Sequence, residues 1–201
     1  MKRIIIPLVL ALIVLASCQT GKVTTALNQK EAGNIEEALE MINNAVDPAN
    51  EKSEKTIGWP RTWEVRGEIY QSIFKSEDAK VKKLAENPLG EALRSYQKAL
   101  ELDEKDKFSK SVKIKLTLLS NDLTNQAVQA FNEENYDKAL NSFENILELQ
   151  DIPIMKEDSP GAVDTVIIFN AGLAAFNAEE YDKAIKYYSE AAEYGYNGAR
   201  T

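Results

Sequence analysis

Apolar side chains recur every three or four residues along most of this chain, which is the spacing of one face of an α-helix. Glycine and proline cluster at a few places, which favours long helices over many short strands. The pattern therefore predicts an all-α fold. The predicted helices lie at Leu89–Asp103 and at about 35–46, 110–133, 136–149, 163–178 and 181–194, with a further helix opening at Pro60.

One ten-residue stretch occurs twice. Residues 130–139 read AFNEENYDKA and residues 175–184 read AFNAEEYDKA, so that eight of the ten positions are identical. Composition alone does not repeat a decamer this closely, and the chain is therefore interpreted as a repeat protein.

The segments between the helices predict turns and insertions. Gly33 and Asn34 indicate a turn followed by a helix N-cap, with Glu37 placed to complete a capping box. Residues 18–33 are interpreted as a tether with a marginal first helix, because Val23 and Leu27 are almost its only large apolar residues. The repeat domain is predicted over residues 34–201, with insertions near 76–88 and 150–161.

The N-terminus has the layout of a secretory leader. A basic start is followed by an apolar run from Ile4 to Ala16, shorter than the roughly 20 residues of a spanning helix. Leu15-Ala16-Ser17-Cys18 resembles the lipobox of bacterial lipoproteins. The resemblance implies a signal peptide over 1–17 and a lipidated Cys18. The alternatives are a plain leader with an incidental cysteine and a buried anchor helix.

The lipoprotein resemblance also implies an address. A lipidated protein would be tethered to a membrane of the bacterial cell envelope. Gln19 after the cysteine favours the outer membrane over the inner one. No acidic run follows Cys18, and we therefore expect the protein to face the periplasm.

The second helix of each predicted pair carries small and large apolar residues at matching positions, with Ala92, Tyr96 and Ala99 as the clearest set. Trp63, Gly67 and Tyr70 mark one of the first helices, although Arg66 stands where a leucine is expected. This pattern resembles the tetratricopeptide repeat. The resemblance implies an irregular α-solenoid of about four helical hairpins. A generic helical bundle is the alternative.

The composition excludes several kinds of catalytic and binding site. The chain has no histidine and one cysteine, which excludes histidine catalysis, Cys-His sites and an internal disulfide. Its net charge of −8 without a basic patch excludes nucleic acid as a partner. We expect neither a cofactor nor a metal ion.

Tetratricopeptide arrays bind ligands on the concave side, which the first helices line. The resemblance therefore implies that a protein or peptide partner binds there. The implied partner-binding residues are Glu64, Glu68, Gln71, Asn125, Val128, Phe131, Phe169, Asn170, Leu173 and Phe176.

Helix 163–178 is apolar on more than one side, and two interpretations of this stay open. Such a helix is normally buried, and the linker 150–161 or a following repeat would cover the additional face. The alternative is an open groove for a peptide. The additional face comprises Val166, Phe169, Leu173 and Phe176.

The function predicted from these patterns is a non-catalytic, lipid-anchored scaffold for protein–protein interaction. An accessory lipoprotein for nutrient or glycan uptake is the alternative. A hydrolase using Glu64 and Glu68 is less favoured, because a solvent-exposed acidic stripe explains this pair. The residues from Tyr194 onward resemble the lead-in to another helix, so we expect a truncated array or one completed by a partner.

Overall fold

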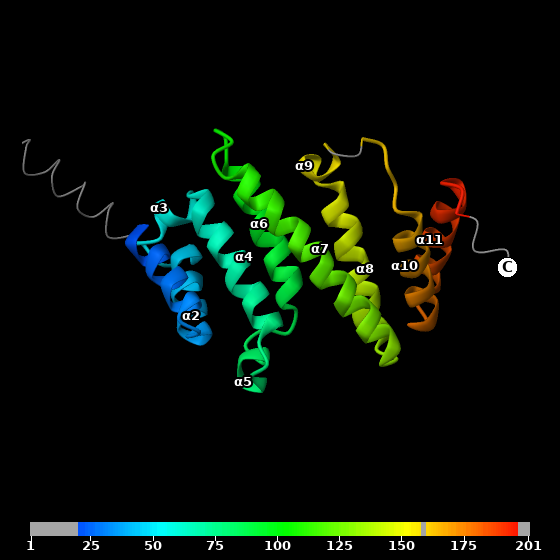
Figure 1. Cartoon of the computed structure of the whole chain (residues 1–201), viewed down its shortest axis with the longest axis horizontal. Coiled ribbons are helices and arrows are strands. Elements are labelled where there is room, and N and C mark those ends of the chain that lie inside the picture. The colour runs from blue at the N-terminus through cyan, green and yellow to red at the C-terminus, as the bar shows by residue number, and fades with distance from the viewer. Residues whose placement is uncertain (1–19, 158–159, 197–201) are drawn as a thin grey trace, which may run out of the picture. The chain divides into compact units, whose positions relative to one another are not determined.

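A computed structural model of the chain describes residues 20–157 and 160–196 (Figure 1). Over these residues the regular structure consists of helices alone, which confirms the predicted all-α fold. Cys18 and the predicted signal peptide lie outside the described residues. Within the described ranges, no helix combines the length and the apolar character needed to cross a membrane.

The helices fall into two compact units. Unit 1 extends to Lys115 and unit 2 begins at Leu116, so the division lies within the long helix α7 (Ser109–Asn132). Sequence patterns gave no sign of this division, because the apolar spacing continues through the helix. The two units are described separately.

The first hairpin of unit 1 pairs a helix at residues 20–31 with α2 (Ile35–Val46). Gly33 has φ +86°, a left-handed conformation that glycine adopts without strain, and the chain reverses there. Val23 and Ala26 are buried. Residues 20–31 therefore form a packed helix, and the prediction of a marginal one is wrong because small residues suffice for close packing.

Asn34 precedes α2 as predicted, but it does not cap that helix with its side chain. Its amide group donates instead to Gln29 Oε1 at 2.7 Å. The predicted capping box is therefore wrong, since the side chain that would open it is bound to the preceding helix.

The second hairpin pairs α4 (Pro60–Lys75) with α6 (Pro88–Leu102), and the short α3 (Glu54–Ile57) precedes it. Between the two long helices lies the predicted insertion, which contains the single turn α5 (Ala79–Lys82). A Cβ added at Gly67 would lie 2.3 Å from Cε1 of the buried Tyr96. The helices approach closely because position 67 has no side chain.

Arg66 replaces the leucine expected at its position and packs by different means. Its guanidinium lies 4.6 Å from the ring centroid of Tyr70, in cation–π geometry. It also donates to Ser95 Oγ at 2.7 Å and pairs with Glu91 at 2.9 Å. The charge is thus satisfied inside the hairpin by α4 and α6 themselves.

In unit 2, the second half of α7 forms a hairpin with α8 (Tyr136–Asp151), in which the Ser142 hydroxyl donates to Gln126 Oε1 at 2.9 Å. Helix α10 (Thr165–Asn177) forms a hairpin with α11 (Tyr181–Glu193). Helix α8 also packs against α10, so consecutive hairpins stack as in an α-solenoid. The predicted linker holds the short helix α9 (Pro153–Lys156), which packs against α8.

The repeated decamer forms the turn of each hairpin in unit 2. Glu134 has φ +61° and Glu179 has φ +63°, and the next residue in each turn donates its backbone N–H to a carbonyl five residues earlier. In each copy a phenylalanine meets a tyrosine edge to face, with ring centroids 5.3 Å apart for Phe131 and Tyr136. The repeated sequence therefore specifies a repeated turn.

Candidate functional site

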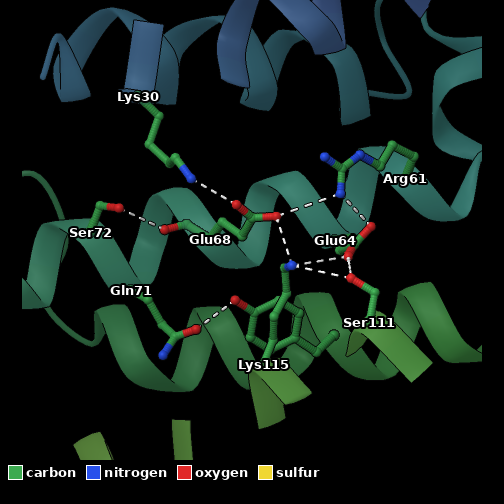
Figure 2. Close-up of polar contacts among 9 residues, drawn as sticks. Lys30, Arg61, Glu64, Glu68, Gln71, Ser72, Ser111 and Lys115 are labelled. Carbon is green, nitrogen blue, oxygen red and sulfur yellow. Dashed lines mark hydrogen bonds and ion pairs between the residues drawn. The ribbon is translucent and has the colours of Figure 1, made fainter. Parts of the chain in front are cut away.

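The acidic pair of α4 lies between two neighbouring helices of unit 1 (Figure 2). Lys30, from the helix at 20–31, places its Nζ 2.7 Å from Glu68 Oε2. Lys115, on the first turns of α7, lies 3.2 Å from both Glu64 Oε1 and Glu68 Oε1. Arg61 lies 2.6 Å from Glu64 Oε2. Three cations thus converge on two carboxylates, and we call these five residues the charged cluster.

Glu64 is fully buried within the charged cluster. Burial alone would raise the pKa of its carboxyl group. The hydrogen bond donated by the Ser111 hydroxyl, the hydrogen bond and charge of Arg61, and the charge of Lys115 all lower the pKa. Together they outweigh the effect of burial, and the pKa of Glu64 is lowered. The carboxylate is held ionised. The interpretation of this pair as a solvent-exposed acidic stripe is therefore wrong for Glu64, because neighbouring cations made burial possible.

Gln71 is also buried, so it offers no accessible surface to a partner. Its Oε1 accepts a hydrogen bond of 2.6 Å from the hydroxyl of Tyr96 (Figure 2). Glu68 is largely enclosed by its ion pairs. Of the three candidate residues on α4, two are therefore structural in this conformation and the third is neutralised by lysines.

Sequence patterns did not identify the cations of the charged cluster. Arg61 lies three residues before Glu64 on the same helix, a spacing at which side chains meet, and this signal was available. Lys30 and Lys115 come from other helices. Their approach depends on how the helices pack, which one sequence does not reveal.

A small apolar recess lies in unit 2, between α7 and α10. It is a cavity of about 120 Å³. Four predicted partner-binding residues line it together with Phe143, a residue of α8 that sequence patterns assigned to packing alone. We call this feature the recess. Its lining residues are Val128, Phe131, Phe143, Asn170 and Leu173.

The remaining candidates of unit 2 do not line the recess. Asn125 is exposed on α7. Phe169 stacks on Tyr196 with ring centroids 4.5 Å apart. Phe176 meets Tyr181 edge to face at 5.9 Å. These two phenylalanines are therefore engaged by aromatic partners within the last hairpin.

Within the described residues, the linker leaves two residues of the additional apolar face of α10 exposed, and coverage by a following repeat stays a prediction. Val166 is 53% exposed and Phe176 is 54% exposed. The physical reason is the course of the linker, whose helix α9 packs against α8. Leu173, on the same face, borders the recess, so part of this face is open and hollowed.

Within the described ranges, no group of three or more Asp, Glu, Cys or His residues is arranged to hold a metal ion. The acidic residues of the charged cluster are already bound by cations of the chain.

Residues 167–194, which include most of α10 and all of α11, match the family model of the tetratricopeptide repeat. The matched hairpin contains Gly172, where an added Cβ would lie 2.8 Å from Cδ1 of Tyr188, the same close approach as between Gly67 and Tyr96. No curated protein matches the chain. Proteins with this repeat generally serve as scaffolds for protein–protein interaction and are generally non-catalytic.

Proposed function

We propose that this chain, a tetratricopeptide-repeat protein, is a non-catalytic scaffold that holds a protein partner in the bacterial cell envelope, anchored by lipid at Cys18. The anchor rests on the sequence Leu15-Ala16-Ser17-Cys18, and the outer membrane facing the periplasm is the address that this sequence favours. Several acyl chains on one cysteine hold a protein at a bilayer, where a single chain is marginal.

The proposal of a protein partner rests on the recess. Its volume of about 120 Å³ suits one apolar group, since a dry cavity of about 150 Å³ accepts benzene. Val128, Phe131 and Leu173 supply its apolar walls. Helices α7 and α10 are the first helices of consecutive hairpins, and first helices line the ligand side of this family.

The geometry of the recess suggests how a partner would bind. One apolar side chain of a peptide would enter between α7 and α10 and remove its own surface and that of the walls from water. The amide of Asn170, at the same site, can donate to or accept from the peptide backbone. Many peptide-binding grooves achieve selectivity by combining a pocket for one anchoring side chain with a polar contact beside it.

The charged cluster disfavours the hydrolase alternative, which needs Glu64 as a catalytic carboxyl group. A general acid needs a carboxyl group that is protonated near the working pH, which requires a raised pKa. The pKa of Glu64 is lowered, and its oxygens accept from Ser111 and Arg61. Such a carboxylate neither donates a proton nor reaches a substrate.

A matched pair of variants tests the recess. Val128 and Leu118 lie on the same helix and are each 50% exposed, but only Val128 lines the recess. The partner is first obtained by affinity capture from envelopes with the parent protein, and its binding to each variant is then measured. We expect Val128→Asp to weaken binding at least tenfold and Leu118→Asp to leave it unchanged. Equal affinities of both variants would refute the proposal, and retention of a polysaccharide in place of a protein would favour glycan uptake.

The anchor needs its own test. Cells expressing the parent or Cys18→Ser are grown with a radiolabelled fatty acid and fractionated. We expect label and membrane association with the parent and neither with the variant. Label in both proteins, or in neither, would contradict lipidation at Cys18.

A further inference from the structure

The negative charge of the chain is concentrated in its second unit. Residues 18–115 contain 17 acidic and 17 basic residues, so their charges cancel. Residues 116–201 contain 15 acidic and five basic residues, which gives a net charge of −10. The two segments meet at the boundary between the two compact units. Solubility alone does not require one neutral and one strongly acidic unit, so the asymmetry points to a charged partner of unit 2.

The basic residues of unit 2 lie away from its first helices. The part of α7 that follows Lys115 and the whole of α10 contain no lysine or arginine. The lysines in the described part of unit 2 lie on α8, α9 and α11. Of these, Lys183 pairs with Glu144 at 3.1 Å and Lys156 with Asp151 at 2.9 Å. The helices that line the recess therefore present no positive charge of their own to a partner.

The two hairpin turns of unit 2 place exposed carboxylates near the recess. Phe131, which lines the recess, directly precedes the turn that joins α7 to α8. Leu173 lines it from α10, which leads to the turn before α11. Figure 1 shows both turns at the same, lower end of unit 2. The exposed acidic residues of these turns are Glu133, Glu134, Glu179 and Glu180.

These turns are within reach of a short segment that is seated in the recess. Glu133 follows Phe131 by two residues, and Glu179 follows Leu173 by six, which is about 9 Å along a helix. An extended peptide advances about 3.3 Å per residue. Basic side chains within three positions of an anchoring residue can therefore approach the carboxylates of both turns.

We propose that the partner segment bound by unit 2 is basic, with one apolar residue that enters the recess and lysine or arginine residues within three positions of it. The inference rests on the proposed function, because it takes the recess as the binding site. Single exposed ion pairs are weak, so the preference comes from several pairs and from the field of the whole unit. That field speeds the association of a basic segment and disfavours an acidic one.

Three synthetic peptides test the charge preference. Each contains one phenylalanine with two residues on either side, which are lysine in the basic peptide, glutamine in the neutral one and glutamate in the acidic one. Their binding to the full chain with Cys18→Ser is measured by fluorescence anisotropy. We expect the basic peptide to bind at least tenfold more tightly than the neutral one at low salt, and the acidic peptide not to bind. The preference should shrink as salt is added, because exposed charges are then screened.

A matched pair of charge variants locates the preference. The first variant replaces the four turn glutamates by glutamine. The control replaces four exposed glutamates of unit 1 in the same way, so that both variants lose equal negative charge. We expect the first variant to lose most of the preference for the basic peptide and the control to keep it. The control positions are Glu40, Glu51, Glu77 and Glu86.

Val128→Asp and Leu118→Asp separate this inference from the proposed function. Both add one negative charge, so loss of the basic peptide with Val128→Asp alone assigns its anchor to the recess. Equal binding of all three peptides, lost with Val128→Asp, would overturn the charge preference and leave the recess standing. Binding of the basic peptide that Val128→Asp leaves unchanged would contradict the recess itself. A basic peptide that does not bind, or a preference that both charge variants retain, would also overturn the inference.

Discussion

Gly67→Ala is the substitution for which the close approach of α4 and α6 makes the firmest prediction. In an exposed helix interior, alanine is more favourable than glycine by about 1 kcal/mol. Here the added Cβ would lie 2.3 Å from Cε1 and 2.7 Å from Cδ1 of Tyr96. Carbon atoms prefer separations of about 3.5–4.0 Å, so the ring or the helix must move by more than 1 Å.

Tyr96 has little freedom to move. The residue is fully buried, and its hydroxyl is held by Gln71 at 2.6 Å. Overpacking of such a site costs about 1–3 kcal/mol, and the strain exceeds the gain in helix propensity. We therefore expect Gly67→Ala to lower the free energy of unfolding by about 2 kcal/mol.

Urea unfolding followed by circular dichroism measures this change, with Gly21→Ala as the matched control. Gly21 is an exposed residue near the start of the helix at 20–31, and an added Cβ there meets nothing within 4 Å. The control should be slightly more stable than the parent, by about 0.5 kcal/mol. In a protein that already carries Tyr96→Leu, Gly67→Ala should cost less stability than it does in the parent. A Gly67→Ala variant at least as stable as the parent would refute the reasoning.

Three further predictions concern stability. Thr62→Val should raise the free energy of unfolding by about 1 kcal/mol in urea titrations, because the buried Thr62 hydroxyl has no hydrogen-bond partner among the described residues. Glu64→Gln should lower it by about 3 kcal/mol at pH 7, because it leaves cations uncompensated. Because the pKa of Glu64 is lowered, its carboxylate stabilises the parent above pH 4.5, and this stabilisation is lost as the pH falls below that value. Glu64→Gln should therefore lose less stability than the parent over the same acid range. Leu140→Ala should cost about 2–5 kcal/mol and Ile185→Ala under about 0.5 kcal/mol, and equal losses would contradict the difference in burial.

Local patterns predicted the helices of the fold well. The stretches at 35–46 and 181–194 match α2 and α11 closely, because their apolar spacing and turn residues agree. Helices α3 and α9 were missed, since each is one turn long and has no periodicity to detect. Repeat similarity also placed Val128, Phe131, Asn170 and Leu173 on one side, and the recess brings these four residues together.

Residues that depend on distant partners were not predictable in the same way. The sequence predicts a solvated Glu64, because its partners Ser111 and Lys115 lie on α7, far from it along the chain. Phe143 belongs to a second helix, and its position in the repeat indicates packing alone, yet it also borders the recess. Periodicity assigns a residue to a face of its own helix. Tertiary packing determines which side chains other helices bring to that face.

Photo-cross-linking in cells tests the central claim most directly. A photoreactive amino acid replaces Asn170 at the edge of the recess, in a protein that keeps Cys18. We predict one discrete protein adduct in the membrane fraction, lost when Val128→Asp is added and retained when Leu118→Asp is added. An adduct pattern that is the same with both added substitutions, or the absence of any protein adduct, would contradict the account.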